Sequence, residues 1–134
     1  MKFVVGIFVF LSSLVATAAE TCDAEFDGLP VCVQVDFTKG PVNRDESQFA
    51  VRFLNTEDGT AVDPQGLKID LWMQMGRHGH GTAPVKIERQ DAGVYFVSEA
   101  YFVMPGQWQV RFFAQDAQGA EKTTEVIVDV PGKH

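Results

Sequence analysis

The chain has 134 residues and a formal net charge of −7, with 18 acidic and 11 basic side chains. This acidic composition contains no basic stripe, which argues against nucleic acid and against anionic membrane surfaces as partners. A chain of this length is expected to form one domain with a hydrophobic core of its own.

The first residues have the composition of a secretory signal. Lys2 precedes an apolar run from Phe3 to Val15, and small residues follow in the sequence ATAAE. The run is shorter than the about 20 residues that a transmembrane helix needs. We therefore predict a signal peptide over residues 1–19 and a single domain over residues 20–134 without a transmembrane segment, located in the periplasm or outside the cell.

Both cysteines lie just after this predicted signal, at Cys22 and Cys32. An even pair of cysteines in an exported protein is typical of a disulfide, and the spacing is not the C-x-x-C of a thiol metal or redox site. We expect Cys22 and Cys32 to be bonded to each other. The bond would then attach the N-terminal arm to the first strand.

The remainder of the chain alternates apolar and polar residues with a period of two, which is the pattern of half-buried β-strands. Seven segments show it, at residues 31–37, 48–54, 67–75, 83–89, 93–104, 106–114 and 124–130. Turn sequences such as EDGT and DAQG lie between them, and no segment outside the signal has a helical period. We predict an all-β fold, an immunoglobulin-like β-sandwich of about seven strands.

One predicted strand does not keep its phase. Tyr95 and Val97 fall on one face of an extended chain, whereas Phe102 and Met104 fall on the other. A bulge or a change of sheet near residues 98–100 would allow both pairs to face the core.

A methionine- and histidine-rich segment, LWMQMGRHGHGTAP, occupies residues 71–84. Met73 and Met75 share a strand face, about 6.6 Å apart along the strand, so two thioethers can approach one ion at the mouth of a sandwich. Met73 also continues the parity of Leu71, and the alternative reading is that it only fills the core.

Two histidines follow in the same segment. His78 and His80 are separated by Gly79 and bracketed by Gly76 and Gly81. Glycine permits positive φ, so we expect a tight glycine turn or loop that aims both imidazoles at one centre. The alternative is a mobile glycine loop in which histidine is only a polar filler.

The ligand types favour copper. Thioethers suit Cu(I) and imidazoles suit copper, zinc and nickel, whereas the lack of carboxylates in the segment disfavours Ca²⁺ and Mg²⁺. Without a free thiolate, a structural zinc site is also disfavoured. We predict a copper site, with Cu(I) as the preferred state, formed by Met73, Met75, His78 and His80. Met104 is a further candidate if its strand end lies beside Met75, and core packing is its alternative role.

Two stretches, WMQMGRHGHGTAPVKI and GVYFVSEAYFVMPGQWQVRF, resemble the YtkA-like and FixH-like family. The resemblance implies an exported or membrane-tethered immunoglobulin-like sandwich. It also implies a link to copper handling or to the assembly of copper-containing respiratory enzymes, and hence a copper-containing or copper-handling envelope protein as partner. The chain departs from FixH-like members because its mature part lacks a transmembrane anchor, which weakens an oxidase-assembly role.

Enzyme classes find little support in the sequence. It contains no G-x-S-x-G elbow, no H-E-x-x-H helix and no nucleotide-binding glycine loop, so we expect a non-enzymatic protein. The alternative to a copper domain is a metal-free immunoglobulin-like module of the cell envelope, which would use an exposed sheet face or edge to bind a protein partner.

Overall fold

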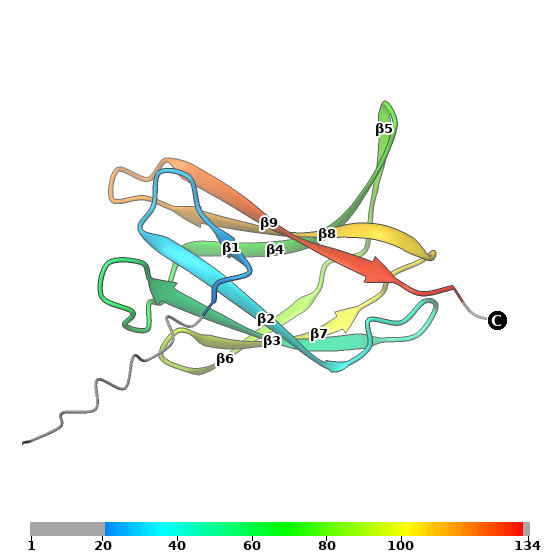
Figure 1. Ribbon diagram of the computed structural model, residues 1–134, viewed down its shortest axis with the longest axis horizontal. Helices are drawn as coiled ribbons and strands as arrows, with labels where there is room; N and C mark the ends of the chain where they lie inside the picture. The colour runs from blue at the N-terminus through cyan, green and yellow to red at the C-terminus, as the bar shows by residue number, and fades with distance from the viewer. Residues whose placement is uncertain (1–20, 133–134) are drawn as a thin grey trace, which may run out of the picture.

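A computed structural model describes residues 21–132, so the predicted signal peptide at residues 1–19 lies outside the described part of the chain. The strands are β1 (Ala24–Glu25), β2 (Val31–Lys39), β3 (Ser47–Asn55), β4 (Gln65–Met75), β5 (His78–Gly81), β6 (Lys86–Asp91), β7 (Val94–Ala100), β8 (Gly106–Gln115) and β9 (Glu121–Val130). They form two antiparallel sheets, in the orders β1-β2-β3-β7-β6 and β5-β4-β8-β9 (Figure 1). The predicted all-β sandwich is confirmed, and the short strands β1 and β5 are additional to the seven predicted segments.

The core lies between the inner faces of the two sheets. Phe49 and Phe53 of β3 and Trp108 and Phe112 of β8 are fully buried. The rings of Phe53 and Phe112 meet edge to face across the layers, with 6.0 Å between their centroids. The buried Trp108 indole donates a hydrogen bond to the Met104 carbonyl oxygen at 2.9 Å. Alternation along each strand thus places the apolar residues inside, as the period-two pattern predicts.

The predicted change of phase in β7 is a bulge. Ser47 pairs with Ala100 but Phe49 pairs with Val97, so β7 has one residue more than β3 over this stretch. Glu99 carries the extra length at a φ of 55°. As a result Val97, Ala100 and Phe102 are all fully buried, which confirms that both parities face the core.

The N-terminal arm is attached to the first sheet by a disulfide between Cys22 and Cys32, as predicted. Cys32 lies in β2, and β1 pairs with the same strand. Asp23 adds a polar contact, since its carboxylate accepts a hydrogen bond from the Val35 amide at 2.7 Å. Residues 21–132 contain no helix with the length and apolar character needed to cross a membrane.

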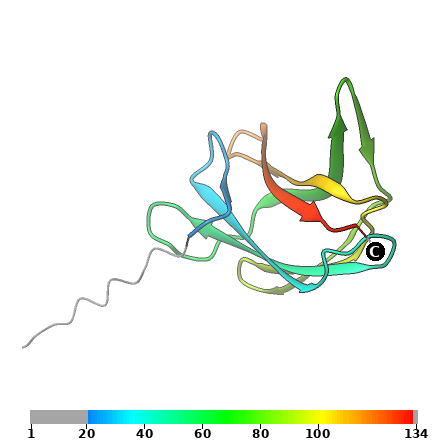
Figure 2. The same cartoon turned by 45° about the vertical axis from the view of Figure 1, so that its right-hand side comes forward.

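Strand β4 has β8 along one edge and β5 along the other. It pairs with β8 from Gln65 to Trp72, with a register shift between Gln65 and Lys68, and with β5 from Trp72 to Met75. The end of β4 therefore leaves β8 and continues into a two-stranded hairpin, which stands clear of the sandwich in Figures 1 and 2. The HGHG sequence, which we expected to be a glycine turn or loop, is instead the strand β5.

Candidate functional site

The turn of the β4–β5 hairpin consists of Gly76 and Arg77, between the paired residues Met75 and His78. Gly76 has a φ of 58°, and Arg77 has an ordinary negative φ. Glycine at the first central position of a two-residue turn is typical of the type II′ hairpin, whose twist matches that of the flanking strands. The tight turn expected from the glycines thus forms at Gly76, whereas Gly79 and Gly81 lie in extended backbone.

Four of the predicted ligands lie on one face of this hairpin. Met75 pairs with His78, and Met73 pairs with His80. Directly opposite residues of an antiparallel pair point to the same side, with Cβ atoms about 4.5–5.5 Å apart, and residues two apart on a strand share a face. The two thioethers and two imidazoles are therefore neighbours on the face that continues the core side of β4. We call these four side chains the Met/His face.

The four side chains differ in exposure. Met73 is only 6% exposed, whereas Met75 is 46% exposed and both histidines are exposed. The Met73 methyl group reaches the start of β8, where a Cβ built on Gly106 would lie 2.9 Å from its Cε atom. Met73 thus fills the edge of the core, and Met75, His78 and His80 form the accessible part of the face.

Met104 is not part of the hairpin and belongs to the segment between β7 and β8. Its side chain is half-buried and packs against the core. Its backbone carbonyl accepts the Trp108 hydrogen bond. The structure does not pair Met104 with any residue of the Met/His face, so its role as a ligand remains a prediction.

The opposite face of the hairpin carries Trp72, Gln74, Gly79 and Gly81. The Trp72 indole lies across β5, because a Cβ built on Gly79 would be 1.9 Å from its Cζ2 atom. At Gly81 the corresponding distance to the indole is 3.6 Å. Glycine is therefore required at position 79 because any side chain there would overlap the indole. The positive φ that we expected glycine to supply is not the reason.

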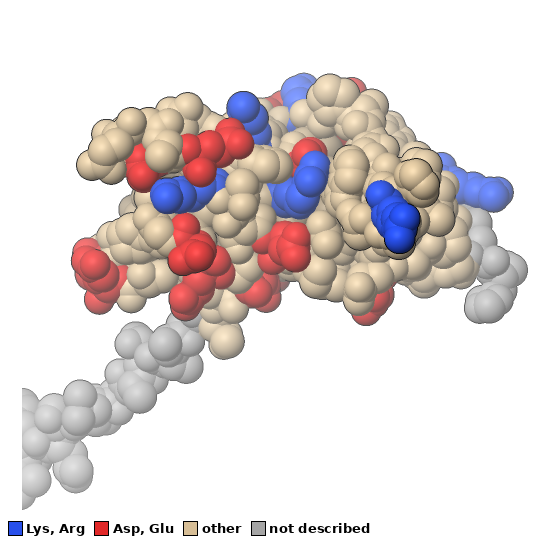
Figure 3. Space-filling model, turned by 90° about the horizontal axis from the view of Figure 1, so that it is seen from above, with Lys and Arg blue, Asp and Glu red and all other residues tan. Residues whose placement is uncertain are grey.

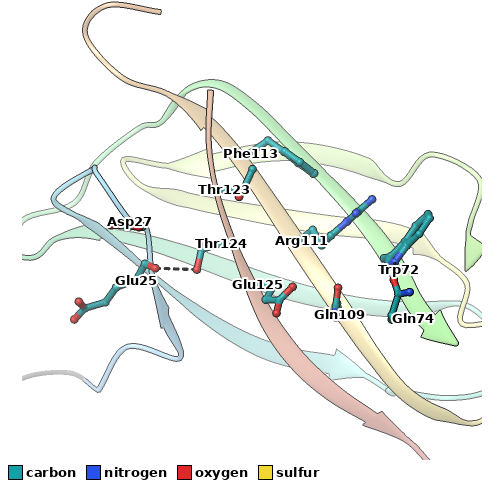
Figure 4. Close-up of a pocket in the computed structure, with 10 residues that line it drawn as sticks. All are labelled: Glu25, Asp27, Trp72, Gln74, Gln109, Arg111, Phe113, Thr123, Thr124 and Glu125. Carbon is teal, nitrogen blue, oxygen red and sulfur yellow. Dashed lines mark hydrogen bonds between the residues drawn. The ribbon is translucent and has the colours of Figure 1, made fainter. Parts of the chain in front are cut away.

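The indole is held from the other side by β8. The Arg111 guanidinium lies over the Trp72 ring, 4.5 Å from its centroid, and Figure 4 shows the arginine directed toward the indole. Asp70 fixes that guanidinium through two hydrogen bonds, at 2.7 Å from Nε and 2.6 Å from Nη2. These bonds raise the pKa of Arg111 above its ordinary value. A cation over an indole is a favourable arrangement.

A shallow groove of about 610 Å³ crosses this outer face of the second sheet. Its lining residues are Glu25, Asp27, Trp72, Gln74, Gln109, Arg111, Phe113, Thr123, Thr124 and Glu125. Thr124 donates to the Glu25 carbonyl oxygen at 2.9 Å and so joins β9 to the N-terminal arm (Figure 4). The groove and the Met/His face lie on opposite sides of β4, so they are separate surfaces.

Most of the acidic side chains on the face seen in Figure 3 lie toward the left of the view. Strand β5 lies toward the right in Figure 1, from which Figure 3 is turned about the horizontal axis. Among residues 21–132, no three His, Cys, Asp or Glu side chains gather as a metal-binding group. A site on the hairpin would therefore depend on its methionines, and its ligand set suits a soft ion.

Sequence reasoning missed the roles of Trp72 and Gly79. The signal is present once HGHG is read as a strand, because WMQM and HGHG then alternate strictly between two faces. The loop expectation rests on the positive φ that glycine permits, whereas only Gly76 of this segment uses it.

Taken together, these features define an all-β sandwich with a projecting hairpin that carries methionine and histidine on one face. The family model described as YtkA-like matches residues 30–113. The chain belongs to the YtkA-like family, and the matched region includes the whole β4–β5 hairpin. Comparison with curated proteins and with solved structures gave no match.

Proposed function

We propose that this chain is an exported, non-enzymatic copper-binding domain, which holds Cu(I) on the Met/His face and delivers it to a copper-handling protein of the cell envelope. The observation that carries the proposal is the β4–β5 register, which pairs Met75 with His78 and Met73 with His80. Thioether and imidazole are ligands that Cu(I) accepts. The disulfide between Cys22 and Cys32 is consistent with an oxidising compartment outside the cytoplasm.

The exposure of the face favours delivery over permanent storage. Met75, His78 and His80 are exposed on a hairpin that projects from the sandwich. A partner's ligands can therefore approach the ion without opening the core. Met73 is the least accessible of the four side chains of the face. Met104 is a weaker candidate for a copper ligand because it lies outside the hairpin.

Competition with a Cu(I) chelator tests the proposal. The wild-type protein should bind one Cu(I). His78→Ala/His80→Ala should lower the affinity for Cu(I) by roughly 100-fold or more. This loss exceeds the about 10–100-fold that follows when a residue supporting the ligands of a metal is changed. Met75→Leu removes an exposed sulfur at nearly constant volume and should also weaken binding.

Met73→Leu makes the same change at the buried member of the face, and we expect a smaller loss of affinity because the accessible donors are Met75, His78 and His80. Equal affinity in the wild type and the double histidine variant would remove the Met/His face as the site. No binding by the wild type would leave the metal-free interaction module as the remaining function.

A further inference from the structure

The two faces of the β4–β5 hairpin are joined through Trp72. The hairpin carries its accessible donors on one face and the indole on the other, pressed against Gly79 of β5. Beyond Trp72 the strand β4 no longer pairs with β8. Within the described chain, the position of β5 therefore depends on the short β4–β5 ladder and on the indole that crosses it.

The indole is itself fixed by polar contacts on both sides. Its Nε1–H donates to Gln74 at 3.0 Å, and the Gln74 amide donates to the carbonyl oxygens of Gly76 and His78 at 2.8 and 3.3 Å. The Arg111 guanidinium covers the ring from β8. These contacts form a continuous path from the rigid sheet, through the indole, to the backbone of the turn and of His78.

We propose that Trp72 is the positioning residue of the Met/His face. By filling the space above Gly79 and bracing β5 against β8, the indole sets where His78 and His80 stand relative to Met75. This proposal rests on the proposed function of the hairpin as a Cu(I) site. The indole lies on the opposite face, so it acts on the ion only through the backbone that carries the ligands.

Two alanine substitutions in the same strand test this role. Gly79→Ala would place a methyl group 1.9 Å from the indole, whereas at Gly81 the added group would lie 3.6 Å away, an ordinary contact. We expect Gly79→Ala to lower the Cu(I) affinity of the purified protein by about 10–100-fold, as changes around a metal's ligands do. Gly81→Ala, which makes the same chemical change, should stay within about twofold of wild type.

A double-mutant cycle separates positioning from general destabilisation. Trp72→Ala should lower the affinity by a similar factor to Gly79→Ala. In the Trp72→Ala background, Gly79→Ala should cause no further loss, because the group it displaces is gone. Thermal unfolding of each variant shows that the sandwich remains folded. Equal affinities for Gly79→Ala and Gly81→Ala, or a full additional loss in the Trp72→Ala background, would overturn the proposal while leaving the Cu(I) site in place.

Amide hydrogen exchange distinguishes the two proposals if the wild type binds no Cu(I). Faster exchange of the β5 amides in Gly79→Ala, with wild-type exchange in Gly81→Ala, would support the positioning role of Trp72 although the copper function had failed. Equal exchange in both variants would overturn the positioning role itself.

Discussion

Two hairpins of this molecule make contrasting use of a two-residue turn. The β6–β7 hairpin lies within the first sheet, where β7 pairs with β3 along its length. The β4–β5 hairpin leaves the second sheet at Trp72 and projects from it. The first hairpin is extended on its β7 side by β3, whereas the second is braced by the side chains on one of its faces. The comparison shows how the fold combines a rigid support with an accessible surface.

The β6–β7 turn is fixed by both its neighbours and one carboxylate. The Gly93 carbonyl accepts from the Phe53 amide at 2.8 Å. Asp63 accepts from the Gly93 amide at 2.9 Å, from the Tyr95 hydroxyl at 3.0 Å and from Arg89 through two bonds of 3.1 and 2.9 Å. Within residues 21–132 no equivalent carboxylate supports the β4–β5 turn, where the acceptors are carbonyl groups and the donor is the Gln74 amide. The β4–β5 turn, which contains Arg77, is therefore held by neutral groups of its own hairpin.

The largest predicted effect is at Gly93. It has a φ of 67°, and an added Cβ would lie 2.7 Å from the Phe53 carbonyl oxygen and 3.0 Å from the Val62 amide nitrogen. These are main-chain atoms that cannot move aside. We expect Gly93→Ala to lower the free energy of unfolding by about 2–5 kcal/mol, from the left-handed backbone and the overpacking together. Denaturant unfolding measures the change.

The same substitution at Gly76 should have a smaller effect. Its φ is 58°, but an added Cβ would meet nothing within 4 Å. Gly76→Ala should therefore cost only the backbone term, about 1–2 kcal/mol. If Gly76→Ala proved as destabilising as Gly93→Ala, the β4–β5 hairpin would have to pack more closely than the structure shows, and the contrast between the hairpins would be lost.

The smallest predicted effect is on the loss of stability at acidic pH. The hydrogen bond from Arg89, followed by that from the Gly93 amide, lowers the pKa of Asp63 from 3.8 to about 2. Because the folded pKa is the lower one, the stabilisation is present above about pH 4 and is lost as the pH falls toward 2. The group is exposed, so its contribution is screened.

Asp63→Asn should accordingly lose less stability than wild type as the pH falls from 4 to 2. The midpoint of thermal unfolding, measured at each pH, gives the stability. Asp129→Asn, on the exposed side of β9, changes the net charge equally and is the control. An identical pH dependence in Asp63→Asn and wild type would mean that Asp63 does not support the β6–β7 turn in this way.

Much of the sandwich could be predicted because burial in a sheet leaves a period-two record. That record located the strands and also revealed the bulge, since Val97 and Phe102 cannot both face the core of an unbroken strand. The disulfide followed from the number and position of the cysteines. These features depend on short-range pattern, and the structure confirms them.

The hairpin was predicted less completely, for two physical reasons. Its strand β5 contains glycine at alternate positions. Glycine has no side chain, so its apolar or polar character cannot indicate which face of the strand is covered. What covers Gly79 is the side chain of Trp72, and what fixes that side chain is Arg111 with Asp70. Such contacts between strands distant in the sequence depend on the register between β4 and β8, which local pattern does not determine.

The two-residue turn at Gly76 and Arg77 also sets the register of β5 against β4. Because directly opposite residues share a face, deleting Arg77 while keeping a two-residue turn would shift the β5 register by one residue and exchange the two faces of β5. Gly79 and Gly81 would then stand opposite the two sulfurs. His80 would lie opposite Gln74, on the face of the Trp72 indole, and His78 would fall in the turn. Register, as much as residue identity, therefore determines which chemistry this hairpin presents to its surroundings.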